Sequence, residues 1–392
     1  MTGIAATVPL VDHHCHGVVT RELDRPGLEA LISEGGAPPP GQTNFDTSIG
    51  LAIRRHCAPV LDLPPHASAE DYLARRAELG SAEVSRRFLA ATGTARYLVD
   101  TGFNPTGLTT PEELTALTGS ATDHVVRLES VAEQLATDGV EPGEFADRFA
   151  QELAASVEAV GAVGVKSVAA YRTGLRLDPR RPGSAEVASA AARWLEAGPG
   201  AGGWRMADPV LQRLSMWAAV DLGKPIQFHI GFGDADIRLS EVDPSLLTDW
   251  LVQHRVPVML LHCWPYHREA SYLACIHANV HLDVGSVLHY LGPRRAIPVF
   301  AEAAEMTPFG RLLYSSDAFG APELYLLGAH TFRVALAALL ADRVDSGEWT
   351  VADAERFAHL VAHGNAERIY GLPGGSAGGS AGGSAGGSAG PA

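Results

Sequence analysis

The segment VPLVDHHCHG, residues 8–17, joins a short apolar run to three histidines and a cysteine. A run of this length and composition predicts a buried strand, and the histidines lie at its carboxyl end. Residues two apart on an extended strand point the same way, so His14 and His16 are expected to face one side together and His13 the other. Three imidazoles at a strand end indicate a site rather than a core.

Seven more runs rich in Val, Ile and Leu follow, separated by amphipathic stretches. Nearly continuous apolar strands that alternate with helices predict a parallel sheet buried on both faces. Eight such units predict an α/β fold of the (β/α)8 TIM-barrel type, which needs roughly 250 residues. An open doubly wound sheet is the alternative, but no GxGxxG motif follows the first run. The predicted strands are Thr7–His13, Ala95–Phe103, Val125–Glu129, Val163–Ala170, Pro225–Ile230, Val256–His262, Val280–Val284 and Arg311–Ser316, and predicted helices include Glu144–Val160, Asp208–Asp221, Tyr266–His277 and Pro322–Leu340.

The barrel is expected to occupy residues 1–372, with its surplus length directly after the first strand. Residues 18–94 contain a proline-rich loop, GAPPPG, and two helical patterns at Ala69–Leu79 and Ala82–Ala91. These features predict a helical insertion that covers one end of the barrel. Residues 373–392 are almost entirely a Gly, Ser and Ala repeat, which can bury very little surface, so we expect a flexible tail or linker.

Composition limits the classes of partner. A net charge of -15 argues against nucleic acid and against an anionic membrane, because both reward a basic face. No stretch is expected to reach the length of a membrane span. The four cysteines are scattered without a CxxC motif, which favours a reducing cytoplasm. We therefore expect a cytoplasmic protein that acts on a small molecule, and the sequence leaves a homo-oligomer open.

Metal-binding residue types recur at the ends of the predicted strands. His229 ends the fifth run, His262 ends the sixth, and Asp317 follows the eighth. Parallel barrels gather their functional groups at the carboxyl ends of the strands. Together with His14 and His16, these side chains predict a site for one or two divalent ions, zinc above all, with a position left for water.

The same motifs resemble those of a known family. VDHHCHG, QFHIGFGDADIRL, LLHCWPYHREASYLA, LLYSSDAFGAPELYLLGA and NAERIYGL are similar to segments of the amidohydrolase superfamily, and the similarity extends over residues 8–372. Within the superfamily the chain most resembles the amidohydrolase-2 branch and the amidohydrolase-like half of FluG-type proteins. The resemblance implies metal ligation by His14, His16, His229 and Asp317, with His262 beside the site. The branch includes both hydrolases and non-oxidative decarboxylases, so the fold alone does not decide the reaction.

Lys166 is the second feature that the resemblance brings forward. Many members of the superfamily hold two metals bridged by a carboxylated lysine at the end of the fourth strand. The chain has 30 basic residues, of which only Lys166 and Lys224 are lysines, and Lys166 lies inside a predicted buried strand. An amine can lose a proton in a desolvated site, whereas a guanidinium cannot. We expect Lys166 to bind or adjoin the metal; the alternative is an ordinary strand lysine paired with an acid.

The favoured reaction is metal-dependent hydrolysis of a C–N (amide) bond. Asp317 would take a proton from the attacking water, and His262 would either complete a second metal site or stabilise negative charge on the carbonyl oxygen. Arg172 is the first choice for a substrate carboxylate. The resemblance suggests a small polar substrate such as a γ-glutamyl amide or an N-acyl amino acid. A metal-dependent decarboxylase remains an alternative, as does a non-catalytic barrel that only binds ligands.

Overall fold

Seven parallel strands form one sheet in chain order, as expected for a barrel. The computed structural model describes residues 2–102 and 107–373, so the predicted tail, apart from its first residue, lies outside the described residues. Each strand pairs in parallel with the next one along the chain. The strands are β1 Leu10–Cys15, β2 Thr94–Asp100, β3 Ala121–Arg127, β4 Gly164–Ser167, β5 Ile226–Ile230, β6 Val258–His262 and β7 Val280–Leu282.

The eighth run, predicted as a strand at Arg311–Ser316, is irregular but still closes the ring. Leu313 donates its N–H to the carbonyl of Leu282 in β7 at 2.9 Å. On the other side, Asp317 donates its N–H to the carbonyl of His14 in β1 at 3.0 Å. The intervening N–H of Ser316 bonds instead to the carboxylate of Asp12 at 2.8 Å, and this diversion explains why no regular ladder forms. The predicted (β/α)8 architecture is confirmed.

Several predicted strand ends are wrong by a few residues. Thr7 ends the first helix, and β1 starts only after Pro9, which has no N–H to give to a ladder. β3 ends at Arg127, so Glu129 belongs to the following helix. β4 ends at Ser167, and Ala170 lies in a short 3-10 turn.

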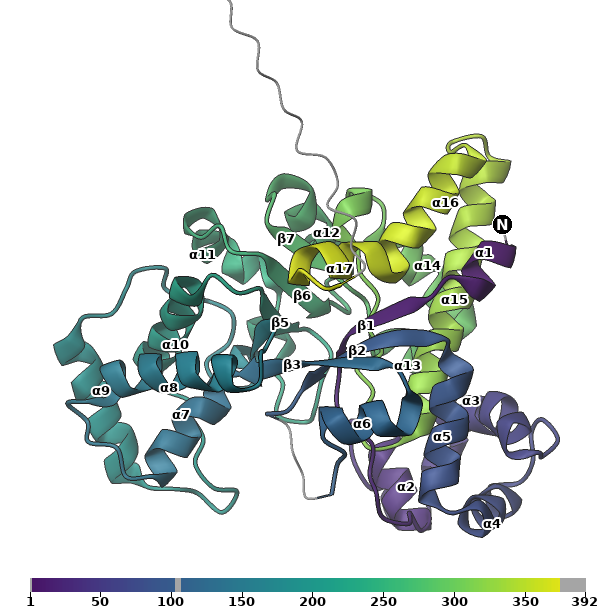
Figure 1. The fold of residues 1–392 in the computed structure, drawn as a ribbon, viewed down its shortest axis with the longest axis horizontal. Helices are drawn as coiled ribbons and strands as arrows, with labels where there is room; N and C mark the ends of the chain where they lie inside the picture. The colour runs from purple at the N-terminus through teal and green to yellow at the C-terminus, as the bar shows by residue number, and fades with distance from the viewer. Residues whose placement is uncertain (1, 103–106, 374–392) are drawn as a thin grey trace, which may run out of the picture.

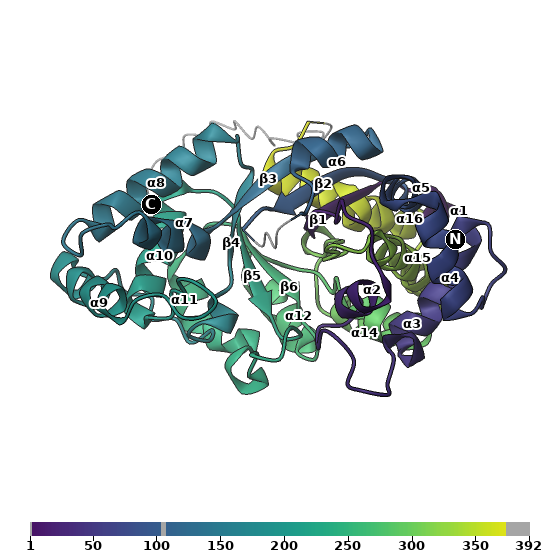
Figure 2. The same cartoon turned by 90° about the horizontal axis from the view of Figure 1, so that it is seen from below.

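The helices lie around the sheet in two groups. Figures 1 and 2 both place α7–α11 to one side of the strands and α3–α5, α15 and α16 to the other. The predicted helices at α4, α5, α8, α10, α12 and α15 are all present. The helices are α1 Thr2–Thr7, α2 Arg25–Leu31, α3 Ser48–Ala52, α4 Ala69–Leu79, α5 Ser81–Thr92, α6 Pro111–Thr118, α7 Leu128–Thr137, α8 Phe145–Ala159, α9 Ser184–Ala197, α10 Pro209–Leu222, α11 Thr248–Gln253, α12 His267–Ile276, α13 Val287–Leu291, α14 Pro293–Ala303, α15 Pro322–Asp345, α16 Val351–His359 and α17 Asn365–Tyr370.

The helical insertion after β1 packs mainly against α15. Its apolar residues share a core cluster with Leu324 and Leu327 of that helix. A buried ion pair reinforces the contact, with Arg76 Nε 2.7 Å from Glu323 Oε1. Tyr72 donates its hydroxyl to the same carboxylate at 2.8 Å, so the buried charge is both paired and hydrogen bonded.

α15 corrects one expectation about the chain. Its 24 residues are long and apolar enough to cross a membrane by length and composition, contrary to the prediction that no stretch would be. However, 67% of its most apolar window is buried inside the fold, as in the core helix of a soluble protein. The apolar length of α15 is explained by two-sided packing, between the barrel and the insertion.

Candidate active site

Four predicted residues converge where the strands end. His14 Nε2 lies 3.2 Å from Asp317 Oδ1, and His16 Nε2 lies 3.7 Å from the same oxygen. His262 Nδ1 lies 3.5 Å from Asp317 Oδ2. We call these four residues the His–Asp cluster. Within it, His14, His262 and Asp317 each offer a ligand atom within 4.8 Å of the others, close enough to hold one metal ion.

The hydrogen bonds of Gln227 fix the tautomer of His14. The Gln227 amide nitrogen donates to the carbonyl of His13 at 2.7 Å and to the hydroxyl of Tyr370 at 2.8 Å. Its amide oxygen, 2.9 Å from His14 Nδ1, must therefore accept a proton from that nitrogen. The lone pair of His14 is left on Nε2, which faces Asp317. Such outer partners orient metal-binding imidazoles and raise their basicity.

The tautomer of His16 is fixed in the same way, by a hydrogen bond to a backbone carbonyl. Its Nδ1 donates to the carbonyl of Asp100 at 3.0 Å, which leaves the lone pair on Nε2. The Asp100 carboxylate, at the end of β2, also lies within 4.8 Å of ligand atoms of His14 and His16. However, Arg127 Nη2 bonds to Asp100 Oδ2 at 2.6 Å and the N–H of Gly102 to Oδ1 at 2.9 Å. These bonds suit Asp100 better to orienting its neighbours than to ligating an ion.

His262 supplies the clearest sign that the cluster lacks a partner. It is fully buried at the end of β6, and neither ring nitrogen has a hydrogen-bond partner among the described residues. A buried polar group without a partner costs about 1–3 kcal/mol. His262 and Asp317 also adopt positive φ angles of 67° and 51°, a backbone strain that concentrates at functional sites. A divalent ion bound by the cluster would satisfy the imidazole, so the residues present fit a metal.

His229 lies beside the cluster rather than inside its tightest part. Its ring centroid is 4.6 Å from that of His262, and its Nε2 donates to the carbonyl of Phe232 at 2.7 Å. That bond leaves the lone pair on Nδ1. A side chain at Gly233 would have its Cβ 2.1 Å from the hydroxyl oxygen of Tyr171, so only glycine lets this loop press against the His229 and Tyr171 rings.

Lys166 points at the cluster from β4. Its Nζ donates to His14 Nε2 at 3.1 Å, and the side chain is buried. Burial lowers the pKa of Lys166 to about 8, against the opposing attraction of Asp100 and Asp317. The amine therefore lies next to His14 Nε2, the candidate metal-binding nitrogen, and carries a proton that it can lose near neutrality.

Electrostatics keep the imidazoles of His14, His229 and His262 neutral and the carboxylate of Asp317 ionised. Burial and the nearby Lys166 lower the pKa of His14 to about 3. Burial also lowers the pKa of His262 and of His229. Burial alone would raise the pKa of Asp317, but the adjacent histidines more than offset it and hold that pKa well below its usual range. Neutral imidazole and ionised carboxylate are the forms that bind metals.

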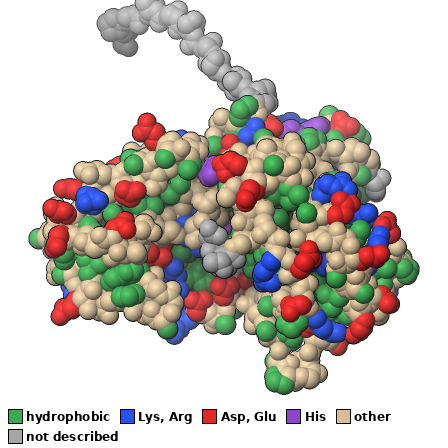
Figure 3. Space-filling model, turned by 60° about the horizontal axis from the view of Figure 1, so that its bottom comes forward, with side chains coloured by type: hydrophobic (Ala, Val, Ile, Leu, Met, Phe, Trp, Pro, Cys, Tyr) green, Lys and Arg blue, Asp and Glu red, His purple; other side chains and the backbone are tan. Residues whose placement is uncertain are grey.

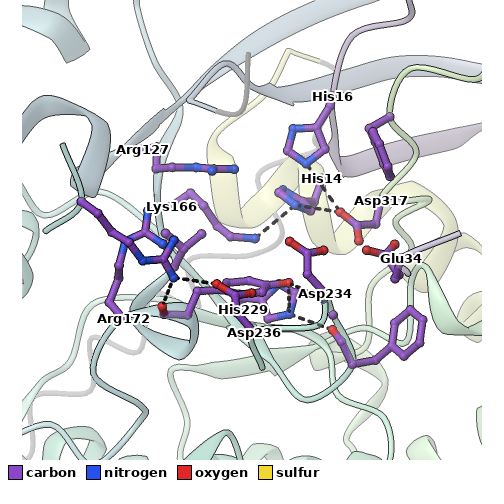
Figure 4. Close-up of a pocket in the computed structure, with 16 residues that line it drawn as sticks. His14, His16, Glu34, Arg127, Lys166, Arg172, His229, Asp234, Asp236 and Asp317 are labelled. Carbon is purple, nitrogen blue, oxygen red and sulfur yellow. Dashed lines mark hydrogen bonds and ion pairs between the residues drawn. The ribbon is translucent and has the colours of Figure 1, made fainter. Parts of the chain in front are cut away.

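The cluster opens into a cavity of about 220 Å³. Charged side chains of both signs border a hollow near the centre of the face in Figure 3. Figure 4 shows Arg172 and Lys166 toward one side of the cavity and Glu34 and Asp317 toward the other. The side chains that line it are His14, His16, Glu34, Arg127, Lys166, Val168, Tyr171, Arg172, Arg205, His229, Phe232, Gly233, Asp234, Asp236, Asp317 and Phe319.

Arg172, the predicted carboxylate-binding residue, lies in the cavity wall. Its Nη2 is 3.4 Å from Glu133 Oε1, and its buried Nε has no hydrogen-bond partner in the described part of the chain. Burial lowers the pKa of Arg172, but a guanidinium remains charged at any physiological pH. A guanidinium held in this way can donate to a ligand carboxylate while it keeps its contact with Glu133.

Comparison with known proteins identifies the family. A family model described as amidohydrolase matches residues 127–372, which is more than half of the chain. The chain belongs to the amidohydrolase family. This membership confirms the predicted amidohydrolase-2 branch and the prediction of a hydrolase.

Individual relatives of this amidohydrolase agree. It is 28% identical over 404 aligned positions to Protein fluG of Emericella nidulans, covering 93% of this chain and 46% of that protein, so it spans about half the length of this curated relative. The solved structure of a "putative metal-dependent hydrolase" from Lactobacillus casei ATCC 334 gives a TM-score of 0.79 at 28% identity, covering 94% of this chain and 97% of the other. A uronate isomerase from Bacillus halodurans C-125 gives 0.62 at 14% identity, covering 94% and 95% of the two chains, and shares the fold alone.

Several residues of the amidohydrolase site were not predicted. Asp100 ends β2 and could have been found from its strand-end position, had the predicted strand not run on to Phe103. Gln227 was hidden because an amide inside an apolar run has no chemical signature of its own. Glu34 comes from the insertion, far from any predicted strand, and carries no signal in the sequence.

Proposed function

We propose that the protein is a metal-dependent amidohydrolase that cleaves the amide bond of a small polar substrate, such as a γ-glutamyl amide or an N-acyl amino acid. One or two divalent ions, zinc by preference, would be held by His14, His16, His229, His262 and Asp317, with Lys166 adjoining. The observation that carries the proposal is the buried His262 without a hydrogen-bond partner, next to His14 and Asp317. When bound, the metal would lower the pKa of a water and polarise the scissile carbonyl.

The protein's own groups would divide the remaining tasks. Asp317, ionised and partly exposed to the cavity, accepts the proton of the attacking water through a carboxylate oxygen and passes it to the leaving nitrogen. Gln227 holds His14 in the tautomer that keeps Nε2 unprotonated. Arg172 binds a substrate carboxylate and so orients the amide toward Asp317.

The proposed location is a reducing cytoplasm. Cys15, Cys57, Cys263 and Cys275, all within the described residues, form no disulfide. Three of them are buried, as expected of cysteines that serve as small apolar residues.

Metal content and product analysis together test the proposal. Protein purified without chelator should contain at least one divalent ion per chain. It should release amine from γ-glutamyl amides or the free amino acid from N-acyl amino acids. His14→Gln should lose metal and activity. The matched control is His254→Gln, which should keep both metal and activity. His254 is buried outside the cavity, and its ring centroid lies 4.4 Å from that of Trp250. Active protein without stoichiometric metal would refute the proposal, and CO₂ as the product would indicate a decarboxylase.

A further inference from the structure

A pair of acidic side chains in the cavity is not used by the proposed reaction. Glu34 reaches the cavity from the insertion between α2 and α3, and Asp234 reaches it from the loop after β5. Their carboxyl groups are close enough to share a hydrogen bond, and Tyr290 donates its hydroxyl to Glu34 at 3.3 Å. Burial, and then Asp234, raise the pKa of Glu34 to about 9. Two adjacent carboxyl groups repel each other when both are ionised, so without a cation beside them this pair retains one proton.

The basic side chains of the cavity do not balance this pair. Arg205 bonds to Asp236 at 2.7 Å, and Lys166 donates to His14 at 3.1 Å. In the described part of the chain, neither Glu34 nor Asp234 forms an ion pair with a basic side chain. The acidic pair could therefore receive a cationic group from a ligand.

The other side of the cavity carries the complementary feature. Arg172 has a buried Nε without a hydrogen-bond partner in the described residues, and it faces the cavity across from Glu34 in Figure 4. Three residues of the His–Asp cluster, His14, His16 and Asp317, lie nearer Glu34 than Arg172 does, and Asp317 and Glu34 are on the same side (Figure 4). A ligand that spans the cavity thus meets Arg172 at one end, and Asp317 together with the acidic pair toward the other end (Figure 4).

We infer that the substrate is an amide with an ammonium group on one side of the scissile bond and a carboxylate on the other, and that Glu34 and Asp234 bind the ammonium. The inference rests on the proposed amide hydrolysis and narrows its substrate class. Among N-acyl amino acids, it selects those whose acyl group carries a free amine, as in a dipeptide. A cavity of about 220 Å³ suits a ligand of that small size.

Two probes that differ only in the ammonium test the inference. L-alanylglycine carries both charges, and N-propionylglycine has a hydrogen where the ammonium was. We expect the metal-loaded wild-type enzyme to prefer alanylglycine at least tenfold in kcat/KM. Glu34→Gln keeps the shape and removes the charge, so it should bring the ratio close to one by slowing alanylglycine alone. L-alanine methylamide lacks the carboxylate that Arg172 would bind, so its kcat/KM should be lower than that of alanylglycine. Because it keeps the ammonium, Glu34→Gln should slow it as it slows alanylglycine.

Controls separate specificity from structure. Glu70→Gln removes an exposed carboxylate of the same insertion and should leave the preference intact. A merely structural role for Glu34 would lower both probes equally in Glu34→Gln and would overturn the inference. Loss of metal in that variant would also overturn it, because the acidic pair would then bind an ion rather than an ammonium.

The inference and the proposed function fail differently. Equal turnover of the two probes by the wild type would overturn the inference and leave amide hydrolysis standing. If neither probe is hydrolysed by protein with stoichiometric metal, hydrolysis of this substrate class fails, and calorimetric affinities decide the inference alone. Tighter binding of alanylglycine, lost in Glu34→Gln, would support it, and equal or undetectable binding of both would overturn it.

Discussion

The Gln227→Leu variant tests the reasoning about the metal site without substituting any of the proposed metal ligands. The variant replaces a fully buried amide with an apolar side chain of similar size. It removes the acceptor of the His14 Nδ1 proton at 2.9 Å and the donor to the His13 carbonyl at 2.7 Å. The hydroxyl of Tyr370 keeps a hydrogen-bond partner in the variant, because it also lies 3.1 Å from His13 Nδ1.

The expected magnitudes follow from those bonds. Two buried polar groups, on His14 and His13, lose a partner, at about 1–3 kcal/mol each, so the free energy of unfolding should fall by about 2–6 kcal/mol. His14 also becomes free to change tautomer and rotate. Loss of an outer partner of this kind lowers metal affinity about 10–100-fold, which corresponds to about 1.4–2.7 kcal/mol.

Gln212→Leu is the matched control. Gln212 is equally buried, and its amide donates to Glu129 at 2.8 Å on the α7 side of the sheet, without contact to a proposed ligand. Its loss should cost about 1.5–3 kcal/mol of stability, because the bond is to a charged group, while metal affinity stays unchanged. Chelator competition measures the metal dissociation constant, and urea unfolding of the metal-free protein measures stability. Unchanged metal affinity in Gln227→Leu, or equal weakening in both variants, would refute the reasoning.

Three further predictions concern other parts of the molecule. Asp317→Asn should lower kcat about 10²–10⁴-fold with the circular dichroism spectrum unchanged, because the proton acceptor is lost and the shape is kept; near-normal turnover would assign the proton to another group. Lys166→Arg should reduce the metal content per chain and most of the activity although the charge is retained, and full metal content in that variant would separate Lys166 from the metal. Arg76→Ala should destabilise the fold by about 3–5 kcal/mol in urea unfolding, because it leaves Glu323 buried without its cation. Arg86→Ala, which breaks an exposed pair, should leave stability nearly unchanged, and similar losses in the two variants would contradict this.

Much of the barrel and of the candidate metal site can be predicted from the chain alone. Apolar runs that alternate with amphipathic stretches predict the parallel sheet, because strands buried on both faces must be apolar along their length. The strand period of two places His14 and His16 on one side and sends His13 to the other, where its Nε2 meets Asp283 at 2.7 Å. Strand ends meet at one edge of a parallel sheet, so His262 and Asp317 could be brought to the same place without knowledge of the packing.

Only the tertiary structure decided how those residues are held and what surrounds them. The strand-like run before Asp317 turned out irregular because a buried carboxylate, Asp12, takes the N–H of Ser316. Gln227 and Glu34 gain their roles from contacts with segments far away in the chain, and neither residue lies at a position that a periodic pattern marks. Local sequence determines which way a side chain points from its own strand, whereas hydrogen-bond partners and the charges that face a cavity depend on distances that only the closed barrel sets.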